Sequence, residues 1–233
     1  MTTFLHPIDC ACARRGLLSA IVCDAISRAA SADRTSGRAP AFDFPDTPAA
    51  GAAEYYLYAL SSPVMVRHCK RSYLFGKALA DKAGAKPDQE ALYVACLLHD
   101  LGLESIFSAP EDFETIGARE AARFLSFRGH ERLAQLVAAA IELHTSVETA
   151  KDPRAEVAFL SMGAFMDVTG ARLDQLDAKL IQEIVEEYPR EGTKALIGGL
   201  LKGEIDAKSQ SRLARLATRV DVLGLVAAAP FDG

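Results

Sequence analysis

Two adjacent ionisable residues, His99 and Asp100, end an otherwise apolar run of the sequence, Leu97-Leu98-His99-Asp100-Leu101-Gly102. Burying a carboxylate without a partner costs a large free energy, so the chain must supply a compensating group. A divalent metal ion is such a group, because neutral imidazole and carboxylate are both good ligands for Zn, Fe and Mn. The pair therefore predicts a metal site at the end of a buried helix.

Two further residues could complete this site from other parts of the chain. His68 lies in a separate predicted helix, and Asp167 is, like Asp100, a single carboxylate in an apolar run. Different helices of a bundle can each bring a polar side chain to one point. We therefore expect His68, His99, Asp100 and Asp167 to hold one metal ion. The alternative for His68 is a place on a helix surface, and the alternative for Asp167 is a helix cap or a buried ion pair.

The elements that must position these residues are predicted to be helices, so we expect an all-α protein. Ala, Leu and Glu recur along the chain, and no long alternating run of Val, Ile and Thr is present. Ser62-Pro63 is a typical helix start, and this helix should end at Gly84. Asp88 should begin the apolar helix that leads to His99. Further helices are expected at about residues 49–60, 115–127, 130–147, 157–168, 173–188, 194–201 and 207–227.

Breaker residues divide the chain into two predicted parts. Residues 31–48 contain one glycine and three prolines, and this stretch predicts a linker after a helix at residues 10–30. We therefore expect residues 1–48 to form an N-terminal extension and residues 49–233 to form the helical bundle that carries the metal site.

The composition excludes several classes of protein. The chain has 233 residues, of which 50% are apolar and 24% are charged, which is typical of a folded protein. Its formal net charge is −5 and it has no basic block, so we expect no nucleic-acid partner. No apolar stretch is long enough to span a membrane. The five cysteines are an odd number without paired CxxC motifs, which favours a cytoplasmic protein with reduced thiols. The apolar face of the last predicted helix belongs either to the core or to a homo-oligomer interface.

The ordered set of His68, His99-Asp100 and Asp167 on a helical background resembles the HD-domain superfamily of metal-dependent hydrolases. The separations are 31 residues from His68 to His99 and 67 from Asp100 to Asp167, and the resemblance covers about residues 48–185. The sequence resembles the cyanamide hydratase branch more locally, in residues 68–76, 97–103, 113–118 and 141–145. The resemblance implies an HD-domain bundle with a mononuclear metal site between central helices. It also implies an enzyme that hydrates or hydrolyses a small polar molecule.

The resemblance favours one divalent ion, most commonly Zn, with Fe, Mn, Co and Ni as alternatives. Two-metal members supply extra histidines before the last aspartate, whereas this chain has only His130 and His144 there, 14 residues apart. Many phosphohydrolases of the superfamily carry a lysine where this chain has Leu103, which favours the hydratase-like branch. A phosphohydrolase acting on nucleotides or other phosphate esters is the alternative. An iron- and oxygen-dependent enzyme and a non-catalytic ligand-binding module are further readings.

Four residues are the candidates for catalysis. Asp100 is expected to bind the metal and to accept a hydrogen bond from an attacking water, whose reactivity a metal would increase. Glu114 and His144 are the candidates for proton transfer, with Thr145 beside His144. Arg71 lies one helical turn after His68, and it or Lys70 could orient a polar small-molecule substrate. The competing prediction is a solvated cation for Arg71, a first-turn helix acid for Glu114 and a core histidine for His144.

Overall fold

The computed structural model describes residues 42–146, 149 and 152–231. Throughout these residues the regular structure is helical, which confirms the predicted all-α fold. The predicted helix at residues 10–30 lies outside the described part of the chain. The described helices are α2 (Pro48–Leu60), α3 (Pro63–Ala83), α4 (Gln89–Leu98), α5 (Phe113–Ser126), α6 (Glu131–Leu143), α7 (Ala155–Thr169), α8 (Ala178–Glu187), α9 (Thr193–Ala207), α10 (Arg212–Ala217) and α11 (Val222–Ala227), with short 3-10 turns at Leu101–Leu103, Ser105–Phe107 and Leu173–Gln175.

Helix α3 begins and ends at the expected capping residues, and α4 begins at its expected cap. The Ser62 side chain accepts a hydrogen bond from the Met65 N–H at the start of α3, and Gly84 ends this helix with a left-handed φ of 67°. The Asp88 side chain accepts a bond from the Ala91 N–H at the start of α4. Caps of this kind satisfy backbone groups that the helix leaves unpaired.

The C-terminal third differs from the sequence prediction at three places. The helix expected at 173–188 is a 3-10 turn followed by α8, because Leu176 is extended and Asp177 caps a new helix. The helix expected at 207–227 is split into α10 and α11, each with its own capping side chain, Ser211 and Asp221. In contrast, α9 runs six residues beyond the expected end at residue 201, to Ala207.

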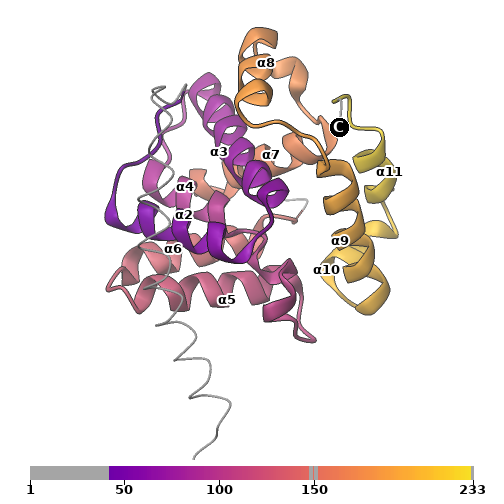
Figure 1. The fold of residues 1–233 in the computed structure, drawn as a ribbon, viewed down its shortest axis with the longest axis horizontal. Helices are drawn as coiled ribbons and strands as arrows, with labels where there is room; N and C mark the ends of the chain where they lie inside the picture. The colour runs from indigo at the N-terminus through magenta and orange to yellow at the C-terminus, as the bar shows by residue number, and fades with distance from the viewer. Residues whose placement is uncertain (1–41, 147–148, 150–151, 232–233) are drawn as a thin grey trace, which may run out of the picture. The chain divides into compact units, whose positions relative to one another are not determined.

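Helix α4 forms the centre of the bundle. Every residue from Ala91 to Leu98 is buried, and α4 packs against α2, α3, α6 and α7. Figure 1 shows α3 in front of α4 and α7, with α5 and α6 along one edge and α9, α10 and α11 along another. The end of α4 therefore places His99 and Asp100 inside the bundle, where neighbouring helices can contact them.

Helices α3 and α7 cross at two glycines. A Cβ atom on Gly163 would lie 2.6 Å from the Gly76 nitrogen, and one on Gly76 would lie 2.5 Å from the Phe159 carbonyl oxygen. Side chains four residues apart share a helix face, so His68 lies two turns from Gly76 and Asp167 lies one turn from Gly163. The close crossing therefore brings His68 and Asp167 together.

The residues just before α2 pack with the bundle, and the chain from Phe42 onward forms one compact unit. The Phe44 ring lies 5.7 Å from the Tyr73 ring and 5.1 Å from the Tyr93 ring. The last residues of the predicted linker thus belong with the bundle. None of the described helices is long and apolar enough to cross a membrane.

Candidate metal centre

Three ligand atoms from two parts of the chain meet inside the bundle. His68 Nε2, on α3, lies 3.2 Å from His99 Nε2 and 3.4 Å from Asp100 Oδ2, and the last two atoms are 3.3 Å apart. All three residues are buried. They form a group of potential metal ligands in the described part of the chain, as the sequence predicted for these three residues.

The size of this triangle fits a metal ion. Tetrahedral zinc holds its nitrogen and oxygen ligands at about 2.0–2.2 Å, which separates any two of them by about 3.4 Å. The three observed separations, 3.2, 3.3 and 3.4 Å, lie close to this value. The residues therefore form one face of a ligand set without any rearrangement.

The protonation of the two imidazoles also fits a cation. His99 Nδ1 lies 2.8 Å from the Cys96 carbonyl oxygen, which only accepts hydrogen bonds, so Nδ1 carries the proton. His68 Nδ1 lies 2.7 Å from Asp167 Oδ2 in the same way. Two unprotonated Nε2 atoms would then face each other, and their lone pairs repel unless a cation lies between them. In the metal-free protein, a proton on His68 can take the place of this cation. Burial lowers the pKa of His68, but Asp100 and Asp167 outweigh burial and raise it.

The electrostatics keep the other two ligands in the forms that a metal binds. Burial alone would raise the pKa of Asp100, but the interaction with His99 and the hydrogen bond from His68 outweigh burial and hold this pKa well below its usual range. Burial lowers the pKa of His99, so its neutral form dominates at pH 7. An ionised carboxylate and a neutral imidazole are the states that bind divalent ions.

His144 is the third histidine of the site. It follows α6, its Nδ1 donates to the Ile141 carbonyl oxygen at 2.7 Å, and its Nε2 lies 3.9 Å from Asp100 Oδ1. Its ring contacts the His99 and Phe113 rings edge-on. Burial and the neighbouring His99 lower the pKa of His144 to about 4. At neutral pH the Nε2 atom is therefore an unprotonated base beside Asp100.

Asp167 contacts the Nδ1 edge of the His68 ring, whereas His99 and Asp100 face the Nε2 edge. It is fully buried, and Oδ2 accepts the hydrogen bond from His68 Nδ1. Arg71 binds the same carboxylate through Nε at 2.6 Å and through its second terminal nitrogen at 3.0 Å, and Arg190 also donates to it. The structure thus forms the buried ion pair that was the alternative for Asp167, and coordination of a metal by Asp167 stays a prediction.

Arg71 is buried and donates all of its hydrogen bonds to protein acceptors. Besides Asp167, it binds the carbonyl oxygens of Tyr188 and Pro189 at 2.8 and 3.0 Å and the Thr193 hydroxyl at 3.1 Å. A guanidinium has five N–H groups, and these contacts use each of them. The predicted contact of Arg71 with a substrate therefore has no free N–H to use. Lys70 faces away as well, toward Glu54 and Tyr93.

A comparison of the whole sequence with families of known proteins agrees with this arrangement. The sequence model of the HD domain matches residues 65–224. The chain belongs to the HD domain family. This family consists of metal-dependent hydrolases, and the match spans the three-atom ligand group and Asp167. No curated protein sequence matches the chain.

Glu114 lies in the first turn of α5. One hydrogen bond connects it to the residue that follows His144 in this HD domain. Its Oε1 accepts a hydrogen bond from the hydroxyl of Thr145, the residue after His144. Burial raises the pKa of Glu114, and the Thr145 hydrogen bond only partly offsets this rise. The structure does not bring Glu114 into the three-atom group, so its role in proton transfer stays a prediction.

Sequence reasoning missed two residues that support the HD domain's metal centre. Arg190, which precedes α9, and Thr193, the first residue of α9, are buried beside Asp167 and Arg71. They follow Pro189 in a polar stretch, which is typical of an exposed loop. The one available signal was the charge of Asp167, since a buried carboxylate needs a partner but does not indicate which one.

Proposed function

We propose that this HD domain is a mononuclear, zinc-dependent hydratase that adds water to a small nitrile-like molecule such as cyanamide. The observation that carries the proposal is the meeting of His68, His99 and Asp100 at one point, with the unprotonated Nε2 of His144 facing Asp100. The local resemblance to the cyanamide hydratase branch and Leu103 after the HD motif support the nitrile substrate class.

The burial of the site supports a small substrate. Asp100, the most exposed of the three ligand residues, has only 7% of its surface exposed, and His144 has 4%. A site of this kind excludes bulk water and strengthens the electrostatic interactions inside it. A compact, uncharged molecule loses little hydration when it enters such a site, whereas a phosphate ester brings a negative charge beside Asp100.

The reaction follows from the positions of His144 and Asp100. A bound zinc ion would lower the pKa of a coordinated water to about 7. Asp100 Oδ1 can accept a hydrogen bond from the attacking water, and His144 Nε2 can take its proton. The water oxygen bonds to the nitrile carbon while the nitrogen gains the proton that His144 carries. Tautomerisation then gives the amide, which is urea when the substrate is cyanamide.

A substrate assay with one ligand variant tests this function. The zinc-loaded wild-type chain should release urea from cyanamide, and Asp100→Asn should lose both bound zinc and at least about a hundredfold in kcat, because a neutral amide is a poor ligand. Asp81→Asn is the control, since this carboxylate lies on α3 but is exposed and pairs with Lys77, one turn away on the same helix. Phosphate release from nucleoside monophosphates, without urea formation, would contradict the hydratase and favour a phosphohydrolase.

A further inference from the structure

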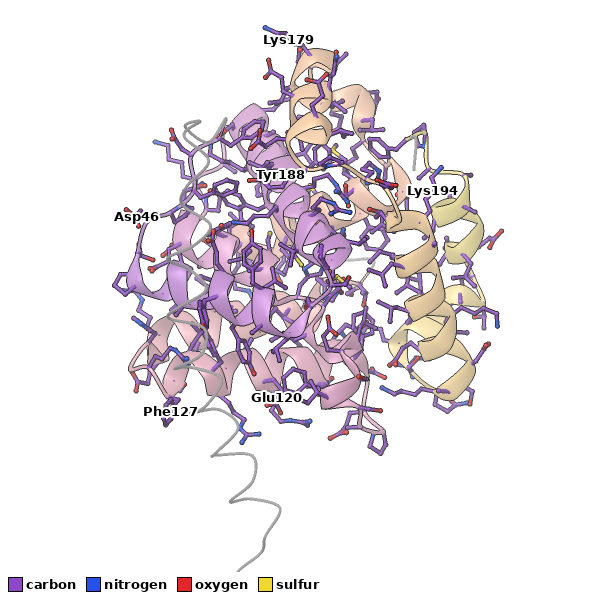
Figure 2. The ribbon with its side chains drawn as sticks, in the orientation of Figure 1. Asp46, Glu120, Phe127, Lys179, Tyr188 and Lys194 are labelled. Carbon is purple, nitrogen blue, oxygen red and sulfur yellow. The ribbon has the colours of Figure 1, made fainter. Side chains whose placement is uncertain are left out.

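A buried cluster of charges lies behind His68, on the side away from the three ligand atoms. We call it the Asp167 cluster, and it consists of Asp167, Arg71, Arg190 and Thr193. All four residues are at most 2% exposed. They come from α3, from α7 and from residues 190–193, which lead into α9, so the cluster joins three parts of the fold. Figure 2 shows Tyr188, whose carbonyl oxygen binds Arg71, between the end of α8 and α3.

The carboxylate of Asp167 is fully used by the protein. Oδ2 accepts hydrogen bonds from His68 Nδ1 and Arg71, and Oδ1 accepts bonds from Arg71 Nε and Arg190. A carboxylate has about four acceptor sites, so these four bonds leave none for a metal ion. Coordination by Asp167 would have to break contacts to two buried guanidinium groups, and uncompensated buried charges cost several kcal/mol.

The position of the Asp167 carboxylate relative to His68 also argues against coordination of a metal by Asp167. Oδ2 lies 2.7 Å from Nδ1, whereas the ligand atom of this imidazole is Nε2, on the other side of the ring. A hydrogen bond at Nδ1 fixes the tautomer and the orientation of a metal-bound histidine, and it raises the basicity of Nε2. Arg71 and Arg190 in turn fix the carboxylate.

We propose that Asp167 is a positioning residue that holds His68, rather than a fourth metal ligand. This inference rests on the metal site of the proposed function. The metal is then held by His68, His99 and Asp100, and a fourth position stays open for water or substrate. Three protein ligands and one open position are typical of catalytic zinc sites. Arg71 and Arg190 act through Asp167 and contact neither the metal nor the substrate.

Cobalt(II) binding separates the two roles, because its visible absorption reports the ligands around the ion. In Asp167→Asn we expect the absorption spectrum of the wild-type complex with a dissociation constant raised about 10- to 100-fold, as for the loss of a residue that supports a ligand. In Asp100→Asn we expect no stoichiometric binding. A changed spectrum in Asp167→Asn, with a loss of binding equal to that of Asp100→Asn, would overturn the proposal.

The Arg71→Lys variant also separates the two roles of Asp167, because they predict different changes in cobalt binding. If Asp167 positions His68, a lysine holds the carboxylate less well, and cobalt binding weakens. If Asp167 is a ligand, Arg71 competes with the metal for it, and the substitution strengthens binding or leaves it unchanged. Circular dichroism identifies variants that do not fold.

A measurement on the wild-type chain covers the case in which these variants fail to fold. In a crystal structure of the zinc-loaded protein, the Asp167 oxygens should remain on His68 Nδ1 and the arginines. An Asp167 oxygen at about 2.0–2.2 Å from zinc would overturn the proposal. A wild-type chain that binds neither cobalt nor zinc would contradict the proposed function itself, which is a different failure.

Discussion

The three histidines of the site share one hydrogen-bonding arrangement. His68, His99 and His144 each have Nδ1 within 2.8 Å of an oxygen atom, and each has Nε2 near Asp100. For His99 and His144 this oxygen is the carbonyl three residues earlier, so the helix end itself sets the tautomer. For His68 this oxygen belongs to the Asp167 carboxylate. The tautomer of this imidazole therefore depends on a residue that is distant in the sequence.

The pH dependence of stability should report the burial of His144. Its pKa is about 4 in the folded chain, against about 6.5 in an unfolded chain, so the unfolded state binds more protons between these values. Stability must then fall on acidification, by about 2 kcal/mol from this residue between pH 7 and pH 5. Urea unfolding of chelator-treated protein at the two pH values measures this change.

Two variants isolate this contribution. In His144→Gln the loss of stability between pH 7 and pH 5 should be smaller by about 2 kcal/mol, because no proton is taken up at this position. His130→Gln, which changes a histidine outside the site, is the matched control for the loss of a histidine. An unchanged pH dependence in His144→Gln would contradict the buried, neutral state of this side chain.

The sequence predicted these residues unequally, for a physical reason. His68, His99 and Asp100 could be predicted, because burying their polar groups requires a shared cation or an equivalent. For Asp167 the same argument left a metal and an ion pair as alternatives. The choice depends on Arg71 and Arg190, and Arg190 reaches Asp167 only through the path of the chain after α8. No local pattern encodes that path.

At the scale of helices, the crossing of α3 and α7 positions the site. Gly76 and Gly163 allow the two backbones to approach, and His68 and Asp167 lie on the same faces as these glycines. The two caps of α3 and the N-terminal cap of α4 made these three bounds predictable. The sequence prediction failed for α8, α10 and α11, since a capping aspartate or serine inside a helical pattern has the same residue type as a solvated one.

The crossing predicts the effect of Gly163→Ala. The new methyl group would lie 2.6 Å from the Gly76 nitrogen and 2.9 Å from its Cα atom, and backbone atoms cannot rotate away. We expect a loss of about 1–3 kcal/mol in the free energy of unfolding, as is typical of overpacking, together with weaker metal binding. Urea unfolding monitored by circular dichroism measures the loss.

Gly199→Ala is the matched control. This glycine also lies within a helix, α9, but among the residues that the structure describes no atom outside that helix lies within 4 Å of the added methyl. Alanine has the higher helix propensity, so stability should rise by up to about 1 kcal/mol. Equal effects of the two substitutions would contradict the close crossing of α3 and α7.

At the scale of the molecule, a metal at this site links α3 to the end of α4, and α4 is the centre of the bundle. An all-helical chain with one buried central helix could be predicted from hydrophobic patterning. The packing of Phe44 onto Tyr73 and Tyr93 could not, because the prolines around it predict a linker. Tertiary contacts override that local signal.

Metal binding should therefore stabilise the whole bundle. A ligand that binds only the folded state, present at a free concentration of 100 times its dissociation constant, adds about 2.7 kcal/mol. Thermal unfolding with and without zinc should show a higher Tm for the wild-type chain and no change for Asp100→Asn. A shift of the same size in Asp100→Asn would place the zinc elsewhere.

The metal content of the purified chain tests the central claim most directly. Elemental analysis of protein loaded with zinc and freed of excess ion should give one zinc per chain, because His68, His99 and Asp100 offer one set of ligand atoms. The same treatment of Asp100→Asn should give almost none. A wild-type chain without stoichiometric metal, or an Asp100→Asn chain that keeps it, would contradict the account.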